Sequence, residues 1–259
     1  MSIKTILVSQ PEPASNRNPY LSLAEKYNLK VDFRPFIHIE GIDKNEFRNQ
    51  KVDFADHTAV ILTSKTAVDH YFRMAEECRY DVTPEMKYFC ISEAVAFYLQ
   101  KYVTYRKRKI FHGKQTIEDL MDAINKHKKE KFILPCSDIL RDNIPEALNK
   151  AKIDFNKAIL YKTVASDLSD LEDVYYDVLV FFSPTDVESL FKNFPDFKQN
   201  NTVIAAFGPT TANAIVSNNL RLDIHAPQPQ VPSMSMAIDQ FIKDLKKTKK
   251  FKVIMKRVG

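Results

Sequence analysis

Two segments of the chain recur later in similar form, and this internal repeat constrains the fold more than any other feature. Ala59–Val68 aligns with Val178–Val187 at a separation of 119 positions (178 − 59), and Phe89–Ala96 aligns with Ala205–Ala212 at 116 positions (205 − 89). Each segment passes from an apolar strand through a short turn into a helix. Because the two separations are nearly equal, the sequence predicts two halves of similar structure.

Apolar strand-like runs alternate with helical patterns along the whole chain, which is typical of α/β proteins with parallel sheets. The expected strands are Thr5–Ser9, Val31–Phe36, Ala59–Thr63, Tyr88–Ile91, Lys131–Pro135, Ala158–Val164, Val178–Phe182 and Val203–Phe207. The first strand and its proline-containing turn are echoed by Phe132–Ser137. We therefore expect an α/β fold of two lobes.

The lobes are not expected to follow one another along the chain. Phe33–Ile39 and Ala158–Val164 are long extended runs at matching places, each suited to crossing from one lobe to the other. If both cross, residues 1–36 and 165–259 form one lobe and 38–162 form the other, inserted lobe. The lobes are then joined by a two-strand linker with a cleft between them, which is the usual ligand site in such architectures.

Length and composition fit a globular protein of this size, with 259 residues, 44% of them hydrophobic and 27% charged. No apolar run reaches the ~18 residues of a membrane span, and the first strand is too short for a secretory leader. The three cysteines, Cys78, Cys90 and Cys136, are scattered and form no CxxC pair. The cysteine pattern indicates reduced thiols, and the missing membrane span and leader indicate a cytoplasmic protein.

The net charge of +5 is concentrated at the C-terminus. From Lys243 onward the chain has seven lysines and one arginine against the single Asp244, a balance of +7, so the preceding residues carry −2. We interpret 246–259 as a solvated basic tail rather than as an arm that binds nucleic acid or a membrane. A second basic cluster, Arg106–Lys109, is interpreted as a solvated edge.

Several cofactor and catalytic motifs are missing from the sequence. The four glycines, Gly41, Gly113, Gly208 and Gly259, form neither a GxGxxG fingerprint nor a GxxxxGK phosphate loop. The six histidines never fall at the spacing of a metal site, and no GxSxG elbow is present. The sequence therefore predicts no nucleotide cofactor, no metal and no hydrolase triad.

Hydroxyl-bearing turns recur instead where strands meet helices. These turns and their neighbours supply the candidate binding residues Ser64, Lys65, Ser92, Ser137, Ser183, Pro184, Thr185, Thr210 and Thr211. Plain N-capping of helices explains any one of them. In a parallel sheet, however, all such turns lie at the carboxyl-end edge, where first-turn N–H groups favour anions. The pattern predicts a small polyanionic ligand.

The motifs, taken in order, resemble the uroporphyrinogen-III synthase family. The segments that carry the resemblance are Leu134–Ser137 with Arg141, Tyr161–Thr163, Phe181–Pro184, Ala205–Ala212 and Ala226–Pro227 before a final amphipathic helix. The likeness extends from about residue 4 to about residue 243, and the charged stretch from Lys246 onward lies outside it. Each motif is weak alone, but their order and spacing are fairly specific.

The resemblance implies two flavodoxin-like lobes and a substrate, hydroxymethylbilane, that carries eight carboxylates. It also implies the reaction, in which the bilane loses water, is attacked by its terminal pyrrole, and closes to uroporphyrinogen III with that ring reversed. The family needs no cofactor, and we expect a monomer. Because the bilane closes unaided to the uninverted isomer, steering would matter more than strong acid–base power.

The resemblance also assigns roles to individual residues. Tyr161 matches a tyrosine proposed to help the hydroxyl leave, although a linker tyrosine packed between lobes is an equal alternative. Ser183, Thr210 and Thr211 match residues of the family's binding motifs, and Arg141 could pair with a substrate carboxylate.

Two loops depart from the family pattern. Ser9-Gln10-Pro11 stands where Thr-Arg-Pro is common, and Ser92 and Val95 stand where a Gly and a Thr are usual. Three other functions stay open: a non-catalytic ligand-binding module on the same scaffold, nucleic-acid binding through the tail, and a glycosyltransferase with two Rossmann-like lobes. The missing glycine-rich loops argue against the last of these.

Overall fold

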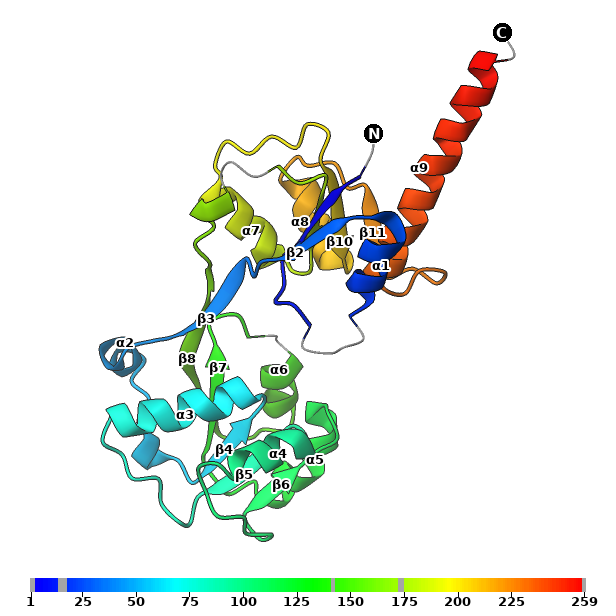
Figure 1. Cartoon of the computed structure of the whole chain (residues 1–259). Coiled ribbons are helices and arrows are strands. Elements are labelled where there is room, and N and C mark those ends of the chain that lie inside the picture. Colours follow the sequence, from blue (N-terminus) through cyan, green and yellow to red (C-terminus); the bar gives the residue numbers. More distant parts are fainter. Residues whose placement is uncertain (1–2, 14–17, 141–142, 172–174, 258–259) are drawn as a thin grey trace. The chain divides into compact units, whose positions relative to one another are not determined.

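The computed structural model describes residues 3–13, 18–140, 143–171 and 175–257, the last ten of these as backbone only. The chain divides into two compact units (Figure 1). Unit 1 consists of Met1–His38 and Val164–Gly259, and unit 2 of Ile39–Thr163. The boundaries predicted from the sequence lie within two residues of these crossing points.

Unit 1 contains a five-stranded parallel sheet in the order β11-β10-β9-β1-β2. Its strands are β1 (Thr5–Val8), β2 (Lys30–Phe33), β9 (Val178–Phe181), β10 (Val203–Phe207) and β11 (Ile224–Ala226). Renumbered along the unit, this order is 2-1-3-4-5, the flavodoxin-like arrangement. The fold class predicted from the sequence is therefore confirmed, although β11 was not among the expected strands.

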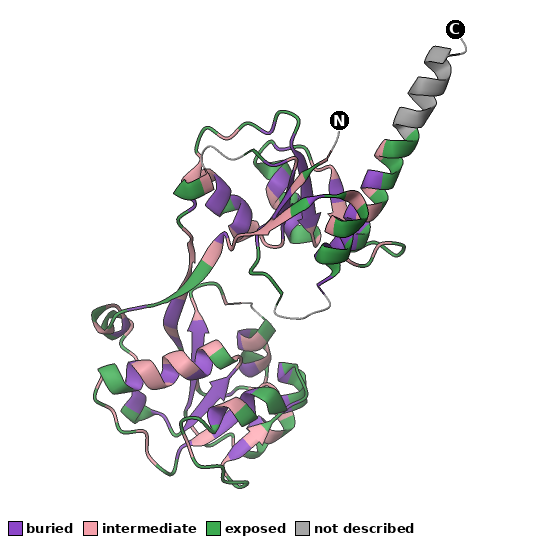
Figure 2. Cartoon of the chain, in the orientation of Figure 1, coloured by how far each residue is buried: buried purple, intermediate pink, exposed green. Residues whose placement is uncertain are grey.

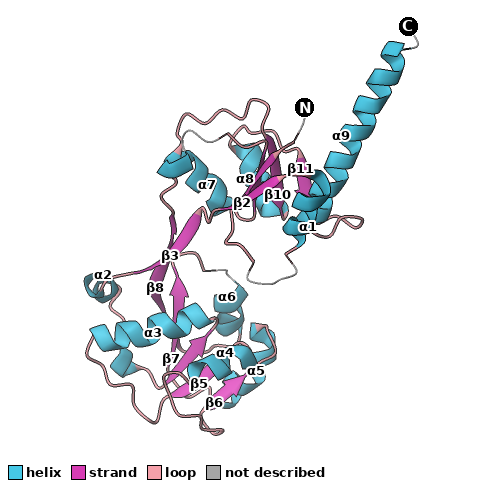
Figure 3. Ribbon diagram, in the orientation of Figure 1, coloured by secondary structure: helices cyan, strands magenta, loops and turns pink. Residues whose placement is uncertain are grey.

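Helices cover both faces of this sheet (Figure 3). Its helices are α1 (Pro19–Tyr27), α7 (Pro184–Asn193), α8 (Pro209–Ser217) and α9 (Met234–Arg257). Strand residues alternate, so Ile6 packs with α1 and α9 on one face, whereas Leu7 packs with α7 and α8 on the other. Figure 2 shows the buried residues concentrated in the strands and on the inner faces of the helices.

Unit 2 contains the second sheet, in the order β3-β8-β7-β4-β5-β6, and all its pairings from β8 to β6 are parallel. Its strands are β3 (Ile37–Gly41), β4 (Ala59–Leu62), β5 (Lys87–Cys90), β6 (Ile110–His112), β7 (Phe132–Ser137) and β8 (Phe155–Ala165). Its helices are α2 (Lys44–Asn49), α3 (Lys65–Glu77), α4 (Glu93–Leu99), α5 (Ile117–Lys126) and α6 (Asn143–Lys150). Helices α3 and α4 pack on one face, and α5 and α6 on the other.

The two units have the same spatial order of strands but a different order along the chain. The series β8-β7-β4-β5-β6 of unit 2 corresponds in position to β2-β1-β9-β10-β11 of unit 1. The equivalences follow the sequence repeat, since β4 matches β9 and β5 matches β10. Unit 2 is thus a circular permutation of unit 1, inserted between β2 and β9.

The first of the two crossing segments is interrupted, which the sequence did not suggest. The expected strand Val31–Phe36 ends at Phe33, and a separate strand, β3, begins at Ile37. Pro35 lies in the interruption, where it has no N–H to donate to a strand ladder. Strand β8, by contrast, is continuous from Phe155 to Ala165, since this segment contains neither proline nor glycine.

The C-terminal segment that the sequence analysis set apart as a tail, 246–259, is not a separate extension as far as Arg257. Its backbone continues helix α9 from Met234 to Arg257. Lysine has good intrinsic helix propensity, and the segment contains neither glycine nor proline before Gly259. The first part of α9 is anchored to unit 1 by the buried residues Met234, Ile238 and Ile242.

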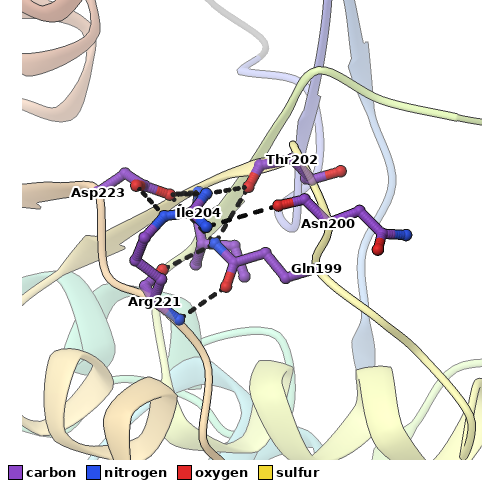
Figure 4. Close-up of polar contacts among 6 residues, drawn as sticks. All are labelled: Gln199, Asn200, Thr202, Ile204, Arg221 and Asp223. Atoms are coloured by element: carbon purple, nitrogen blue, oxygen red, sulfur yellow. Dashed lines mark hydrogen bonds and ion pairs between the residues drawn. The ribbon is translucent and has the colours of Figure 1, made fainter.

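A polar network holds together the loops that precede β10 and β11 (Figure 4). The Arg221 guanidinium donates to Asp223 Oδ1 at 2.6 Å, and the Ile204 N–H donates to Asp223 Oδ2 at 3.0 Å. The Gln199 amide donates to the carbonyl of Thr202 at 3.0 Å. These loops lie at the amino end of the sheet, whereas ligands of parallel α/β sheets bind at the carboxyl end. We therefore interpret the network as structural.

The strand order predicts which fragments fold alone. A fragment of residues 39–163 contains both hydrophobic clusters of unit 2, so we expect cooperative urea unfolding monitored by circular dichroism. A fragment of residues 1–125 lacks β7 and β8, which lie between β3 and β4 in the sheet, so we expect no cooperative transition. Cooperative unfolding of the 1–125 fragment would contradict this organisation.

Candidate functional site

The carboxyl ends of β7 and β4 form the topological switch point of unit 2. These neighbouring strands lead into helices on opposite faces, because α6 follows β7 and α3 follows β4. Ligands of parallel α/β sheets bind at such a point, where the chain diverges and opens a crevice. A pocket of about 470 Å³ lies there, and it includes three of the residues predicted from the sequence, Ser64, Ser137 and Tyr161.

Tyr161 lines this pocket from β8, next to β7. Ser137 pairs with Tyr161 across a register irregularity that begins after Cys136, which pairs with Ile159. The irregularity lets the consecutive residues Leu160 and Tyr161 join the same core cluster, whereas regular alternation would send them to opposite faces. The tyrosine is only 8% exposed, so its ring orientation is fixed by packing.

The environment of Tyr161 favours the neutral phenol. Burial raises the pKa of Tyr161, and a hydrogen bond with the Ser64 side chain only partly opposes this. The His70 ring stacks on Tyr161 with centroids 4.9 Å apart and an interplanar angle of 23°. Arg73 Nε donates to His70 Nδ1 at 3.1 Å, which leaves the His70 proton on Nε2. Burial and the Arg73 charge lower the pKa of His70, so a neutral imidazole supports the phenol.

The turn from β4 into α3 has backbone N–H groups that are not used in hydrogen bonds among the described residues. Ser64 caps α3 by accepting from Ala67 N at 3.0 Å. The N–H groups of Lys65 and Thr66 precede the first intrahelical bond, and no acceptor for them is found among the described residues. The Lys65 side chain is exposed, with its ammonium 5.4 Å from the centroid of the Tyr98 ring.

The other predicted residues of unit 2 are placed differently. Ser92 caps α4, accepting from Val95 N at 3.4 Å, and does not line the pocket. Ser137 Oγ donates to the carbonyl of Ile139 at 2.8 Å, which shapes the turn after β7. Arg141 lies outside the described residues.

At the equivalent switch point of unit 1, a carboxylate of the protein itself links the residues that follow β1 and β9. Asp186, only 2% exposed, accepts three hydrogen bonds on Oδ2. They come from Ser9 Oγ at 2.9 Å, Phe182 N at 3.0 Å and Ser183 N at 3.0 Å. Ser183 in turn caps α7, whose first two residues are Pro184 and Thr185. The donors of this turn are therefore largely used internally.

The turn into α8 is the open one in unit 1. Its N-cap, Gly208, has φ 87° and no side-chain cap, and Pro209 at the first helical position has no N–H. The N–H groups of Thr210 and Thr211 thus point out of the helix end without a side-chain acceptor in the described part of the chain. Thr210 is exposed, whereas Thr211 is buried and its hydroxyl has no partner among the described residues.

Sequence reasoning missed two features that shape these sites. One is Thr116, which lines the pocket of unit 2 and forms a capping box with Asp119; its Thr-x-x-Asp pattern before an apolar run could have revealed it. The other is Asp186, three residues after Ser183, where the equivalent residue of unit 2 is Ala67. The aligned repeat contained this difference between Asp186 and Ala67. Its effect could not be predicted, because Asp186 meets Ser9 only where β1 and β9 are neighbours in the sheet.

The described residues contain no group of three or more His, Cys, Asp or Glu that could hold a metal ion. Within the same residues, no helix has both the length and the apolar character needed to cross a membrane. All three cysteines are free thiols, with Cys90 and Cys136 buried.

Comparison with known proteins gives a consistent family. The family model described as uroporphyrinogen-III synthase HemD matches residues 18–235. The uroporphyrinogen-III synthase of Saccharomyces cerevisiae is 25% identical over 139 residues, which cover 48% of this chain and 50% of that protein. The match thus spans about half the length of this curated relative.

Solved structures agree in fold. The uroporphyrinogen-III synthetase of Helicobacter pylori is 16% identical, with a TM-score of 0.55 over 93% of this chain and 99% of that one. A mutant uroporphyrinogen III synthase from Thermus thermophilus is 15% identical, with a TM-score of 0.50 over 94% of this chain and 99% of that one.

The role of Asp186 can be tested through stability. Asp186→Ala leaves three buried donors without an acceptor, so we expect the free energy of unfolding to fall by about 2–4 kcal/mol. Asp186→Asn keeps an oxygen acceptor and should cost clearly less. Urea unfolding followed by circular dichroism compares the two. Equal losses for both variants would show that the carboxylate oxygen does not satisfy these donors.

Proposed function

Because the chain belongs to the uroporphyrinogen-III synthase family, we propose that it converts hydroxymethylbilane into uroporphyrinogen III, with inversion of the terminal pyrrole and release of water. The observation that carries this proposal is the pocket at the switch point of unit 2, where the buried phenol of Tyr161 lies with the hydroxyls of Ser64 and Ser137. The neutral hydroxyl donors of this pocket suit a substrate whose reacting end is an alcohol.

Tyr161 is the group that we assign to the departing hydroxyl. Electron donation from the pyrrole nitrogen weakens the C–O bond of the hydroxymethyl group. The phenol donates a hydrogen bond, and finally its proton, to the leaving oxygen, which departs as water. The terminal pyrrole then attacks the resulting carbon, and the spiro intermediate fragments and closes again with that ring reversed. The last closure releases a proton from a pyrrole carbon, and this proton restores the phenol.

Steering, rather than acid strength, accounts for the product. The raised pKa makes Tyr161 a weak acid but a dependable hydrogen-bond donor at neutral pH. The stacked His70 ring limits the positions that the phenol can take. A fixed donor selects one orientation of the hydroxymethyl end, and orientation alone can supply a large part of a barrier reduction.

The substrate carboxylates require donors that are not already used. In unit 2, the free N–H groups of Lys65 and Thr66 at α3 meet this requirement, and the exposed Lys65 ammonium adds positive charge. In unit 1, the N–H groups of Thr210 and Thr211 at the start of α8 are also available to bind carboxylates. The Ser183 turn is less suited to this role, because Asp186 already provides its anion.

The difference between the two switch points favours unit 2 for the reacting end. Asp186 in unit 1 would repel a substrate carboxylate from the turn whose donors it already binds. Its counterpart Ala67 in unit 2 leaves the equivalent crevice open beside Tyr161. We therefore assign the chemistry to unit 2 and only carboxylate binding to unit 1.

The setting that we infer is the cytoplasm, which the free thiols of Cys78, Cys90 and Cys136 support. The proposed groups all come from one chain, so the enzyme is expected to act as a monomer. No cofactor is needed for a cyclisation that neither oxidises nor reduces the substrate.

The function is tested with freshly prepared hydroxymethylbilane. Protein treated with a chelator, without added nucleotide, should consume the bilane faster than the spontaneous reaction and yield mainly the type III isomer, resolved by chromatography after oxidation to porphyrins. A heat-denatured sample should yield type I. Activity lost on chelation and restored by a metal would contradict the cofactor-free mechanism, and only type I product would contradict the function.

The role of Tyr161 is tested by Tyr161→Phe, which removes the hydroxyl and keeps the ring. We expect turnover at saturating bilane to fall by about 10-fold or more, toward the low end for a positioned donor because this substrate ionises readily. Thermal unfolding should change little. The matched control is Tyr175→Phe, since Tyr175 is an exposed tyrosine outside unit 2. Full turnover with an unaltered isomer ratio would reduce Tyr161 to a packing residue.

The pH dependence of turnover in the wild type and in Tyr161→Phe tests whether the phenol acts as a hydrogen-bond donor or only as a packing group. Burial raises the pKa of Tyr161 above its ordinary value of about 10, so the phenol keeps its proton as pH rises through the neutral range. The ratio of wild-type to Tyr161→Phe turnover should therefore stay constant from about pH 6 to pH 9. A ratio that declines between about pH 7 and pH 9 would mean a lowered pKa and contradict this environment.

A further inference from the structure

A second pocket in unit 2 carries a concentration of positive charge that the proposed reaction does not use. It has a volume of about 510 Å³, and its lining includes the four cations Lys44, Arg48, Lys51 and Arg79 together with Asp53 and Tyr80. These residues come from α2, from the loop before β4 and from the turn that follows α3. That is the amino-end side of the sheet, opposite to the edge that holds Tyr161.

The cations of this pocket lack counter-ions. Arg48, Lys51 and Arg79 form no ion pair with any described residue, and the Lys44 ammonium donates to the carbonyl of Glu77 at 2.8 Å. Four cations thus face one lining carboxylate.

Three acids near the pocket already have partners. Asp53, the lining carboxylate, caps a short turn by accepting from Ala55 N at 3.0 Å. Glu77 is paired with Arg73, and Glu46 with Lys162. Like charges held together without compensation repel one another, so an anion that binds all of them is favoured.

The pocket also has an apolar wall. Phe47 and Phe54 are each 2% exposed, and the Phe54 and Tyr80 rings stack with centroids 5.6 Å apart and an interplanar angle of 17°. A simple inorganic ion would leave this wall unused. The combination of cationic rim and aromatic wall is complementary to a ring or hydrocarbon body that bears several negative groups.

We propose that this pocket binds a small organic anion with two or more carboxylate or phosphate groups, at a site separate from the one that holds Tyr161. The guanidinium groups of Arg48 and Arg79 pair with the charged groups, and Tyr80 contacts the apolar body. The proposal does not depend on the cyclisation, since none of these residues belongs to the reacting pocket.

Cys78 provides a reporter within the pocket. It is the only cysteine that is not buried, so a neutral disulfide reagent such as 4,4′-dithiodipyridine should modify it alone in the folded protein. Burial raises the pKa of Cys78, with Lys44 and Arg48 opposing, so labelling is followed at mildly alkaline pH. An anion in the pocket shields this thiol sterically and disfavours its thiolate.

The experiment measures the labelling rate of Cys78 in the full chain, with Cys78→Ser as the blank, while benzene-1,3,5-tricarboxylate or inorganic pyrophosphate is added. We expect saturable protection by both, tighter for the tricarboxylate because its ring contacts Tyr80. In Arg48→Gln/Arg79→Gln the apparent dissociation constant should rise by about tenfold or more. The control Lys107→Gln/Arg108→Gln removes the same charge from an exposed cluster outside the pocket and should leave it unchanged.

Three results would overturn the proposal. They are protection that does not saturate, an equal loss of protection in the pocket and control variants, or no protection of the wild type. Tighter binding of pyrophosphate than of the tricarboxylate would keep the anion site but identify phosphate groups as its ligand. Because both arginines are exposed, thermal unfolding should show that the pocket variant folds as the wild type does.

Discussion

The parallel pairing of strands whose helices leave on opposite faces is the constraint from which the functional geometry follows. In unit 2, β7 and β4 are neighbours, yet α6 and α3 pack on opposite sides of the sheet. The chain must diverge at the carboxyl ends of these strands, and this divergence opens the pocket. The side chains at the ends of β4, β7 and β8 meet there whatever their distance in sequence.

The two switch points show how one residue can give similar sheets different roles. Asp186 supplies unit 1 with a buried anion that satisfies the donors around Ser9 and Ser183. Ala67 occupies the equivalent position in unit 2, so no carboxylate lies there beside the Ser64 turn, where the structure has a pocket. In the function that we propose, the repeat keeps one of these sites structural and uses the other for the reaction. The same logic explains why the hydroxyl-bearing turns should not be treated as equivalent.

Much of the fold could be predicted from the sequence, because it depends on apolar runs and on the repeat. The strand cores and both crossing points follow from local patterns around Ala59, Val178 and Ala158. Strand β11 was not predicted, because a strand of three residues gives little periodicity. Strand β3 was not predicted as a separate strand, because the apolar run continues on both sides of Pro35. The basic tail was set apart by its charge, although lysine is compatible with the helix that its backbone forms.

The site was less accessible to sequence reasoning. Tyr161 and Ser64 were named from motifs, but their meeting depends on the irregular pairing after Cys136 and on strand order, which are long-range properties. The His70 stack beneath Tyr161 joins α3 to β8, two elements with no local signal of contact. The basic pocket beside Cys78 likewise combines residues from three separate segments, each of which reads as an ordinary solvated surface in sequence.

The central claim, that the reacting end of the tetrapyrrole lies in the pocket of unit 2, is tested most directly by a crystal structure with uroporphyrinogen III bound under anaerobic conditions. We expect a pyrrole ring or its bridging carbon in that pocket, with the Tyr161 hydroxyl within contact distance and carboxylates at the first turn of α3. A tetrapyrrole bound with that pocket empty would contradict it.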